Sequence, residues 1–557
     1  MADSKTTPSP APEPYPAPQP TLWQRQPLLG WALAVFVLTV VLTNVSFPPV
    51  VAGEFGFVFA VPAVMWAYRA PPFRIFALTV LGAQVVAWTI LLGWLHHVTW
   101  AGLFFLGPFV GLLIGLWYLA VWWTIPRLRG HQLFVRIVAL LGLAGLWVML
   151  EWVRGNIFGG FPWLPLAASQ WQRPFMLQMA AYAGAWSISF VLVVFNLGTA
   201  AFAHRIFFEG TTGLRKRSPE FTATLLVLIA ATFPFIGDTL APQRRKFLRV
   251  ALVQPYIPQG EKWDAAKAQQ ILRTIEKLTF NANDGGAPDV IFWPEASVPW
   301  PLKKDPNMTE WVESVARRTG KPLLLGAVSV DEPDTPAERW RNGAFIVDPM
   351  HGVQYPGYAK RRLVQFGEYI PLRSVLGWLE KVVPIGGDFI PGESAQPLDL
   401  KVGTGTIPVG VLICYEDVFP ELARQSARAG AEVLAVVTND AWYGEGGAAS
   451  QHAAHSVLRA VENRRPVIRC GNGGWSGWID EFGYIRANLR DENDSIYFRG
   501  QRTVTVTRDA RWKGRASAYM QNGDWFVLFS AAMAALAYVV VLVMRPPPRR
   551  TDGEAVY

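Results

Sequence analysis

The sequence predicts two structural parts, a multi-span α-helical membrane domain and an α/β domain in which helices cover β-sheets. Of the 557 residues, 51% are hydrophobic and only 17% are charged. The apolar residues are concentrated before residue 240 and again near the C-terminus. Between these regions, residues 245–515 alternate short β-rich runs with amphipathic helical runs. A chain of this length exceeds one compact core, so more than one structural unit is expected.

The chain begins with a polar, proline-rich segment, residues 1–22, which contains the run APEPYPAPQP. It has almost nothing apolar to bury, so we expect a disordered or extended tail. A polar segment of this length before the first apolar run is a poor fit to a cleaved signal peptide.

Apolar runs long enough to cross a bilayer follow the tail, and we expect about eight transmembrane helices. The 25 tryptophans suit membrane interfaces, where amphipathic rings lie at the level of the headgroups. The expected spans are 28–46, 50–68, 75–95, 101–125, 134–153, 180–203, 221–239 and 524–544.

The loops between the spans set the orientation. If the N-terminus is cytoplasmic, the inside segments carry +8 of the chain's net +9, whereas the short outside loops 47–49 and 96–100 carry no Lys or Arg. Positive charge marks cytoplasmic loops, so both termini are expected inside and the α/β domain on the outer face. The excess charge is then a topology signal, and nucleic-acid binding is not predicted. The inside segments are 1–27, 69–74, 126–136, 204–220 and 545–557.

This topology divides the chain into four segments. Residues 1–22 form a cytoplasmic tail, 23–243 a seven-span membrane domain, 244–518 the α/β domain, and 519–557 the eighth helix and a cytoplasmic tail. Within the α/β domain, runs such as LRVALVQP, DVIFWPE and PVGVLICYE read as strands, and DAAKAQQILRTIEKLTFNA and SQHAAHSVLRAVENR read as helices.

Three residues at predicted strand ends are candidates for chemistry, because open α/β sheets place ligands there. Glu295 closes DVIFWPE, where a turn acid is the plain alternative. Lys360 lies in GYAKRRLVQFGEYIP, where it could equally be a solvated turn residue or pair with Glu368. Cys414 ends a strand and precedes a helix, whose N-terminus favours a thiolate, although a free Cys is commonly a small core residue.

Together, Glu295, Lys360 and Cys414 are far more specific than any one of them. A cysteine nucleophile needs a base to take its proton and a positive group near the developing oxyanion. Glutamate and lysine supply both roles without a histidine. The three residues are 65 and 54 positions apart, each beside a predicted strand.

The motifs WPE, K-x-x-L-V-x-F-G-E and C-Y-E resemble those of the nitrilase superfamily of carbon–nitrogen hydrolases. With membrane spans on both sides of the domain, the chain resembles the apolipoprotein N-acyltransferases. Three further runs support the narrower family, namely VQPYIPQGEKW, EWVRGNIFGGFPWLPLA and TNDAWYG. The resemblance is continuous from about residue 145 to 545 and weak in the first four spans. Gln365 and Gly473 depart from the residues that the family usually has.

The resemblance implies that residues 244–518 are a nitrilase-like catalytic domain, built as an αββα sandwich, and that the reaction is a two-step acyl transfer. Cys414 would take an acyl chain from a phospholipid as a thioester, with Glu295 as general base and Lys360 stabilising the oxyanion. The α-amine of a diacylglyceryl-cysteine at a lipoprotein N-terminus would then accept the chain. Glu368 would hold Lys360. Supporting residues near the pocket would be Trp263, Tyr415 and Glu416, although a first-turn helix acid explains Glu416 equally well.

The resemblance also implies partners and a location. The partners are a phospholipid acyl donor, a diacylglyceryl lipoprotein acceptor and the lipid bilayer, and the chain is expected to act as a monomer without cofactor or metal. The expected location is the bacterial cytoplasmic (inner) membrane, with the catalytic domain on the periplasmic or outer face.

The outer loop after the fifth span is aromatic, which suits an entrance for lipid substrates. Trp163 and Phe161 are the expected lining residues, together with Trp152 and Phe158. The apolar, glycine-rich segment 380–392 would be a lid or membrane-dipping loop, or alternatively a plain surface loop.

Several signals carry less weight. His452 and His455 share a helix face, but a metal needs further ligands, so a structural or pocket-lining role is favoured. His351 lies in a turn, although a pairing with Cys414 stays open, and Cys470 reads as a packed strand residue.

The main alternative to acyl transfer is a membrane-bound amidase or nitrilase that delivers the acyl group to water. Eight spans exceed what a simple tether needs, which favours transfer to a lipid-anchored acceptor. A non-catalytic scaffold is disfavoured by the intact Glu295, Lys360 and Cys414, and a transporter by spans without a paired-charge pathway.

Overall fold

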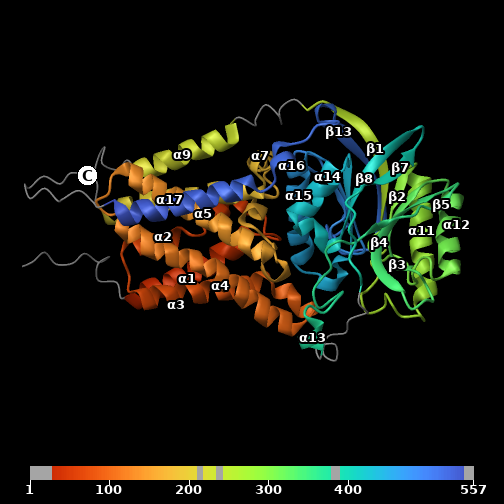
Figure 1. Ribbon diagram of the computed structural model, residues 1–557, viewed down its shortest axis with the longest axis horizontal. Coiled ribbons are helices and arrows are strands. Elements are labelled where there is room, and N and C mark those ends of the chain that lie inside the picture. The colour runs from red at the N-terminus through yellow and green to blue at the C-terminus, as the bar shows by residue number, and fades with distance from the viewer. Residues whose placement is uncertain (1–27, 210–217, 234–241, 378–388, 545–557) are drawn as a thin grey trace, which may run out of the picture.

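The computed structural model describes residues 28–209, 218–233, 242–377 and 389–544. Long helices form one end of the molecule and two packed β-sheets form the other (Figure 1). The expected tails at 1–22 and 545–557, and most of the segment 380–392, lie outside the described residues.

Six helices are long and apolar enough to cross a membrane, in agreement with a multi-span membrane domain. Two other expected spans, 50–68 and 221–239, contain shorter apolar helices in the described part of the chain, and residues 234–241 lie outside it. The number of spans therefore stays a prediction. The helices of this region are α1 (Leu28–Ser46), α2 (Val61–Tyr68), α3 (Phe73–Leu91), α4 (Trp100–Thr124), α5 (Leu133–Asn156), α6 (Pro174–Leu177), α7 (Ala180–Ala183), α8 (Ala185–Phe208), α9 (Pro219–Thr232) and α17 (Trp525–Val543).

Two local features explain where these helices depart from the expected spans. Gly53 and Gly56 lie in a 3₁₀ turn, η1 (Gly53–Phe57), and a Cβ on Gly53 would lie 2.4 Å from the carbonyl oxygen of Ser169. The 50–68 segment is divided between η1 and α2 and is not one long helix. Gly184, with φ +71°, separates α7 from α8, so the long helix begins at Ala185 rather than at residue 180.

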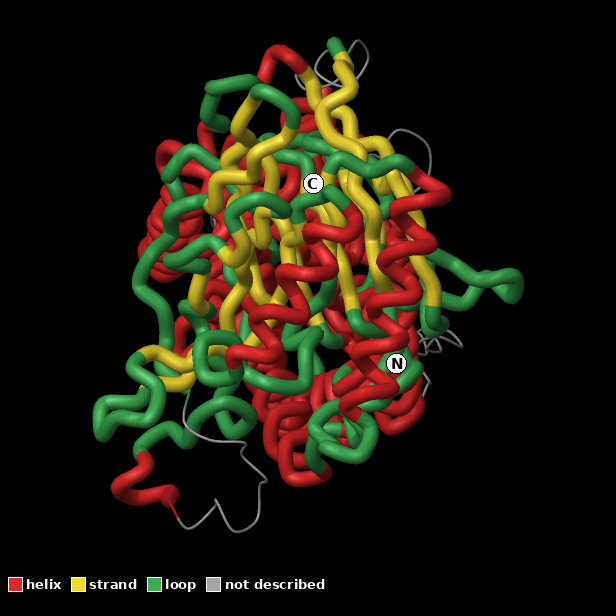
Figure 2. The backbone as a smooth tube through the Cα atoms, turned by 90° about the vertical axis from the view of Figure 1, so that its right-hand side faces the viewer, coloured by secondary structure: helices red, strands yellow, loops and turns green. Residues whose placement is uncertain are grey.

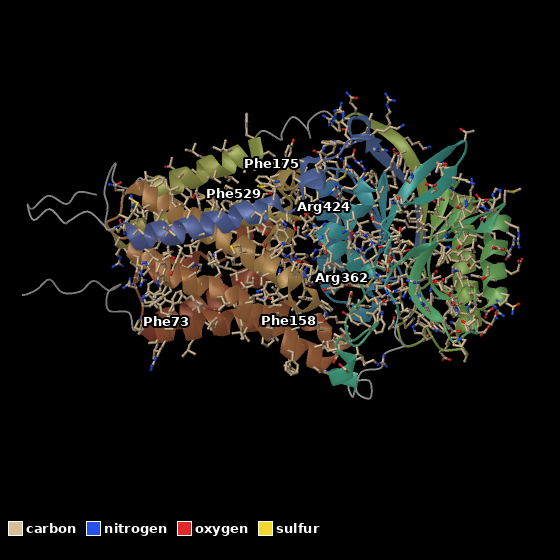
Figure 3. The ribbon with its side chains drawn as sticks, in the orientation of Figure 1. Phe73, Phe158, Phe175, Arg362, Arg424 and Phe529 are labelled. Carbon is tan, nitrogen blue, oxygen red and sulfur yellow. The ribbon has the colours of Figure 1, made fainter. Side chains whose placement is uncertain are left out.

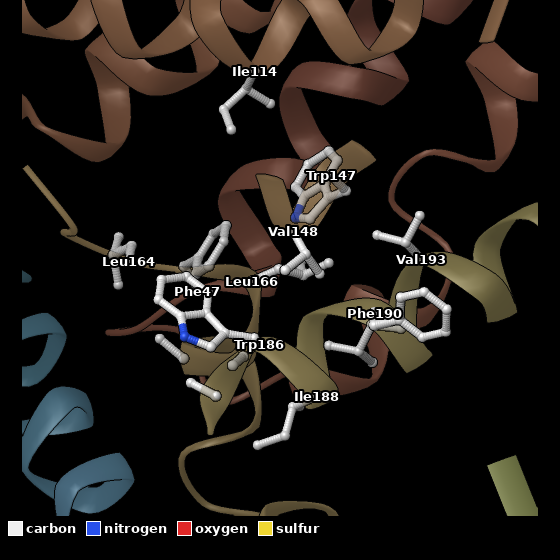
Figure 4. Close-up of a cluster of buried hydrophobic side chains, with 14 of the residues drawn as sticks. Phe47, Ile114, Trp147, Val148, Leu164, Leu166, Trp186, Ile188, Phe190 and Val193 are labelled. Carbon is white, nitrogen blue, oxygen red and sulfur yellow. The ribbon is translucent and has the colours of Figure 1, made fainter. Parts of the chain in front are cut away.

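The last helix, α17, follows both β-sheets in the sequence but packs along α5, which precedes them. A Cβ on Gly142 would lie 2.1 Å from Cβ of Ala537, and one on Gly145 would lie 2.4 Å from the carbonyl oxygen of Ser530. Small residues allow such close helix packing in a bilayer. Nearby, Trp147, Leu164 and Trp186 belong to a buried apolar cluster (Figure 4).

The region between α9 and α17 contains two mixed β-sheets. The first has the order β13-β1-β2-β3-β4-β5, with β6 paired to β4, and the second has the order β12-β11-β10-β9-β8-β7. In the first sheet β1, β2 and β3 run parallel, and in the second β8, β9 and β10 run parallel. The strands are β1 (Arg244–Gln254), β2 (Val290–Phe292), β3 (Leu323–Asp331), β4 (Arg339–Asp348), β5 (Gly352–Val353), β6 (Tyr358–Ala359), β7 (Leu398–Val402), β8 (Gly405–Ile413), β9 (Val433–Thr438), β10 (Val467–Gly471), β11 (Gly477–Ile479), β12 (Ile485–Asn488) and β13 (Gly500–Asp509).

Alternating side chains along the strands build two separate cores. Val250 of β1 faces a core shared by both sheets, whereas its neighbour Ala251 faces a core shared with helices. The first sheet is covered by α11 (Ala268–Gly286) and α12 (Pro306–Thr319), which lie nearest the viewer in Figure 2. The remaining helices of the region are α13 (Arg373–Leu376), α14 (Pro420–Arg428), α15 (Ala448–Asn463) and α16 (Ala518–Asn522).

The second sheet is covered by α14 and α15, which lie between it and the membrane helices (Figure 1). The layers therefore run helix, sheet, sheet, helix, which confirms the expected αββα sandwich. Leu434 of β9, Val457 of α15 and Leu166 of the membrane region all belong to one buried apolar cluster. The core beneath the second sheet is thus continuous with the membrane region.

Candidate active site

The ends of three strands bring Glu295, Lys360 and Cys414 into one buried site. Glu295 follows β2, Lys360 follows β6 and Cys414 follows β8. Their exposed fractions are 6%, 1% and 5%. β2 and β6 belong to one sheet and β8 to the other, so the site forms where both sheets contribute a strand end.

Lys360 joins two carboxylates. Its Nζ lies 3.3 Å from Oε1 of Glu295 and 2.9 Å from Oε1 of Glu368. The same two oxygens accept hydrogen bonds from Nδ2 of Asn342, at 2.8 and 2.9 Å. The other oxygen of Glu368 accepts the backbone N–H of Val364 at 2.8 Å. Glu368 is therefore fixed on both oxygens, whereas Glu295 is fixed on one.

Glu295 is suited to accept a proton through its second oxygen. Its Oε2 is buried and has no hydrogen-bond partner among the described groups. Burial alone would raise the pKa of Glu295, but the charges of Lys360 and Lys262 bring it below its ordinary value. Lys262 Nζ donates to the backbone oxygen of Glu295 at 2.9 Å. The carboxylate is thus ionised at neutral pH, with one oxygen free.

Cys414 is a protonated thiol in the resting site. Burial, and then the charge of Glu295, raise its pKa to about 12, although Lys360 opposes this effect. A thiol is a poor nucleophile compared with a thiolate. Attack by this sulfur therefore requires a base that removes the proton as the reaction proceeds, and Glu295 is the neighbouring carboxylate with a free oxygen.

The backbone at Cys414 makes a sharp turn between β8 and the 3₁₀ helix η9 (Cys414–Val418). Its φ is +51°, a left-handed conformation that non-glycine residues adopt only where the surroundings hold it. Glu416 supports this turn, because its buried carboxylate accepts the N–H of Ile413 at 2.8 Å and the hydroxyl of Tyr358 at 2.8 Å. It also accepts the N–H of Arg361 at 2.6 Å.

Aromatic side chains from the membrane region lie against this turn. The rings of Phe161 and Trp163 each lie 6.4 Å from the ring of Tyr415. Trp163 is fully buried, whereas Phe158 is 84% exposed. Gln365 Nε2 donates to the backbone oxygen of Phe158 at 2.8 Å, which ties the loop after α5 to the catalytic region. Phe158 and Arg362 lie at the boundary between the two regions in Figure 3.

Comparison with known proteins identifies the family. The carbon-nitrogen hydrolase family matches residues 249–541, and the apolipoprotein N-acyltransferase N-terminal domain matches residues 39–198. An apolipoprotein N-acyltransferase of Geobacter metallireducens is 30% identical over 517 residues, which cover 90% of this chain and 94% of that protein. This chain belongs to the apolipoprotein N-acyltransferase family.

Other members of the N-acyltransferase family are similarly related. One from Brucella melitensis is 32% identical and covers 73% of this chain and 74% of that protein. A solved amidase of the nitrilase superfamily from Nesterenkonia is 20% identical, with a TM-score of 0.37, and covers 51% of this chain and 97% of that chain. As a member of the N-acyltransferase family, this chain is an acyltransferase with a nitrilase-type domain.

The site of this N-acyltransferase family member contains polar residues that the sequence did not single out. Lys262 directly precedes Trp263 in the run QGEKW, and this position beside an expected pocket residue is the sequence signal for it. Asn342 lies within β4, where an isolated asparagine gives no local signal. Tyr443 belongs to TNDAWYG, and its burial raises the pKa of its hydroxyl well above the ordinary value.

One expected pocket residue, two expected entrance residues and two residues of lesser weight in the sequence lie outside this polar cluster. Trp263 is 52% exposed, beside the buried Lys262, and its pocket role stays a prediction. Trp163 is buried, and a role for it and Phe161 at an entrance also stays a prediction. His351 is paired with Asp348, with 2.9 Å between Nδ1 and Oδ1. Cys470 is a buried strand residue of β10, and both cysteines are free.

Proposed function

We propose that the chain moves an acyl chain from a phospholipid to the N-terminal α-amine of diacylglyceryl-cysteine in lipoproteins, through a thioester on Cys414. The family relationship and the names of the relatives support this substrate pair. The observation that carries the mechanism is the free, buried Oε2 of Glu295 beside a protonated thiol.

In the first half-reaction, Sγ of Cys414 attacks the ester carbonyl carbon of the phospholipid. Glu295 takes the thiol proton as the carbon–sulfur bond forms, and Lys360 stabilises the negative oxygen, helped by a backbone N–H after Cys414. The carbon–oxygen ester bond then breaks. Glu295 returns the proton to the departing alkoxide, which leaves as a lysophospholipid.

In the second half-reaction, the α-amine of the lipoprotein attacks the thioester carbonyl. Glu295 takes a proton from the nitrogen, and Lys360 again stabilises the tetrahedral oxyanion. Collapse breaks the carbon–sulfur bond and forms the amide, and the sulfur regains its proton from Glu295. The same base thus acts in both steps, and the site returns to its starting protonation state.

The surroundings suit two lipid substrates. Amide formation competes with hydrolysis of the thioester, so a site that limits water favours the amine as acceptor. The aromatic contacts between Trp163, Phe161 and Tyr415 supply apolar walls on the side of the membrane helices. We propose that acyl chains enter from the bilayer along this side.

The location and organisation are part of the same proposal. The loop charges support a cytoplasmic membrane location with the catalytic domain, residues 244–518, on the periplasmic or outer face. Residues 23–243 would form seven spans and residues 519–557 the eighth, with 1–22 as a cytoplasmic tail. The chain would work as a monomer, without nucleic acid as a partner.

The experiment uses the full-length protein in mixed micelles with a phospholipid labelled on an acyl chain. Without acceptor, a hydroxylamine-sensitive label on Cys414 is expected, and Cys470→Ala should behave as wild type. A diacylglyceryl peptide should then remove the label as an N-acyl product. Full activity of Cys414→Ala would overturn the thioester, and release of free fatty acid with no N-acyl product would favour the hydrolase instead.

A further inference from the structure

His452 lies directly behind the nucleophile and has no part in the proton transfers above. It belongs to α15 and is fully buried. Its Nε2 lies 3.1 Å from the backbone carbonyl oxygen of Cys414. This is the peptide group that follows the left-handed φ of +51° at Cys414.

The neighbours of the ring decide which nitrogen carries a hydrogen. Nε2 faces two acceptors, the carbonyl oxygen of Cys414 and Oδ1 of Asp417 at 2.8 Å, so it must be a donor. Nε2–H donates to the Cys414 carbonyl, and the carboxylate of Asp417 lies beside the same hydrogen and attracts it by its charge. This result holds whether the ring is neutral or charged, because only Nδ1 changes.

The other side of the ring is equally constrained. Nδ1 lies 2.8 Å from Oδ1 of Asp440 and 2.6 Å from Nη2 of Arg469. Arg469 also binds Oδ2 of Asp417 at 2.8 Å and Oδ2 of Asp440 at 3.1 Å. Two carboxylates and one guanidinium thus surround the imidazole, and all of these side chains are fully buried. The ring cannot rotate without breaking several charged contacts.

Aromatic rings close the remaining sides. Trp163 lies 5.4 Å and Tyr443 6.3 Å from the imidazole, measured between ring centroids. Trp163 comes from the membrane region, so the imidazole is held jointly by both parts of the molecule. His455, one turn further along α15, binds the N–H of Leu164 instead and does not support the nucleophile.

We propose that His452 is a positioning residue for the nucleophile, whose Nε2–H fixes the Cys414 carbonyl and so holds the left-handed backbone that aims Sγ at the substrate. This inference rests on the proposed role of Cys414. Glu416 holds the Leu412–Ile413 peptide group, one residue before Cys414, through the N–H of Ile413, and His452 holds the peptide group directly after Cys414. The sulfur thus lies between two fixed peptide groups, each anchored to a buried side chain.

The test compares three substitutions that differ in which ring nitrogen they replace. In His452→Gln the side-chain amide can reach the Nε2 position and donate to the Cys414 carbonyl. In His452→Asn the shorter amide can replace only Nδ1, and His452→Leu removes both ring nitrogens. If His452 only stabilised the fold, the activities of the variants would follow their thermal unfolding midpoints. If His452 positions Cys414, the activities follow whether a donor occupies the Nε2 position.

Two rates are measured on full-length protein in micelles, thioester formation from labelled phospholipid and N-acylation of a diacylglyceryl peptide. We expect His452→Asn and His452→Leu to lower kcat by about 100-fold with KM little changed, because misplacement of a reacting atom acts on the chemical step. His452→Gln should recover about 10-fold or more of that loss. His351→Gln, at an exposed histidine, is the matched control and should match wild type.

Equal kcat in His452→Gln and His452→Asn at equal unfolding midpoints would overturn the proposal, as would wild-type kcat in His452→Leu. If the His452 variants do not fold, Asp440→Asn weakens the anchor of Nδ1 and should lower kcat more than KM, and an unchanged kcat there would also overturn it. The Cys414→Ala variant distinguishes a failure of the proposed function from a failure of this inference alone. Its full activity would overturn the proposed function, whereas its inactivity beside a fully active His452→Leu would overturn only this inference.

Discussion

The ammonium of Lys360 lies 2.9 Å from the carboxylate of Glu368, and the lysine is almost completely buried. A buried lysine would ordinarily lose its proton, but the charges of Glu368 and then Glu295 outweigh burial and raise the pKa of Lys360 above its usual range. Lys360 therefore stays positive throughout the reaction. Its charge is offset mainly by Glu368, which leaves the second carboxylate, Glu295, free for proton transfer.

Replacing Glu368 tests whether its charge offsets that of Lys360 and so leaves Glu295 able to act as the base. Glu368→Gln keeps the contact to the Val364 N–H or to Lys360 but removes the charge, so Lys360 should bind Glu295 more tightly and make it a weaker base. We expect thioester formation to fall by about 100-fold or more. The measurement is the single-turnover rate of labelling from a labelled phospholipid. Labelling as fast as wild type would show that Glu295 does not need Glu368.

Gly326 of β3 leaves room for the base. A Cβ at this position would lie 2.6 Å from Cα of Glu295 and 2.7 Å from the backbone oxygen of Pro294. Both are backbone atoms, so Gly326→Ala must displace the segment that carries the carboxylate. We expect a loss of activity of about 100-fold. Gly285→Ala is the matched control, because a Cβ there would meet nothing within 4 Å. Full activity of Gly326→Ala would mean that the segment moves without consequence.

The thiol of Cys414 should titrate far above the ordinary range. Its pKa is raised to about 12 by burial and by Glu295, so the thiolate fraction should keep growing as pH rises through 9. The rate of alkylation by iodoacetamide should therefore increase from pH 7 to 10 without a plateau. Cys470→Ala removes the second thiol from the measurement. A plateau near pH 7 would indicate a preformed thiolate and remove the need for a general base.

Lys262 should make stability depend on alkaline pH. Burial lowers its pKa to about 8 from 10.5, against the attraction of Glu295. Between these values the unfolded chain binds more protons than the folded one, so raising the pH favours folding. Relative to Lys262→Met, wild type should gain about 1–3 kcal/mol between pH 8 and 10. The unfolding midpoints of both proteins in detergent measure this, and parallel curves would contradict it.

The sequence predicted the fold at the level of layers because two patterns were strong. Long apolar runs indicated the membrane helices, and alternating strand and helix runs indicated the sandwich, which the structure confirms. The sequence could not show the close packing of Gly53 against Ser169 or the positive φ of Gly184, because both depend on distant parts of the chain. Hydropathy depends on local composition and carries no information about contacts between distant residues.

The candidate site was predicted where residues followed strands within recognisable motifs. Glu295, Lys360 and Cys414 do lie at strand ends, and Glu368 does contact Lys360. Asn342 could not be predicted, because its importance arises only when β4 places its amide between two carboxylates. The sequence favours a structural or pocket-lining role for His452. Its contact with the Cys414 carbonyl could not be predicted, because it depends on how α15 packs against η9.

The buried apolar cluster that joins Leu434, Val457 and Leu166 has a practical consequence for handling the protein. A fragment limited to residues 244–518 would present the outer side of α14 and α15 to water, although that side is built as an interior surface. Such a fragment should aggregate or need detergent, even though it contains every strand of both sheets. In the whole protein, the membrane region covers this apolar side of α14 and α15. The enzyme therefore has to be produced and studied as a full-length chain.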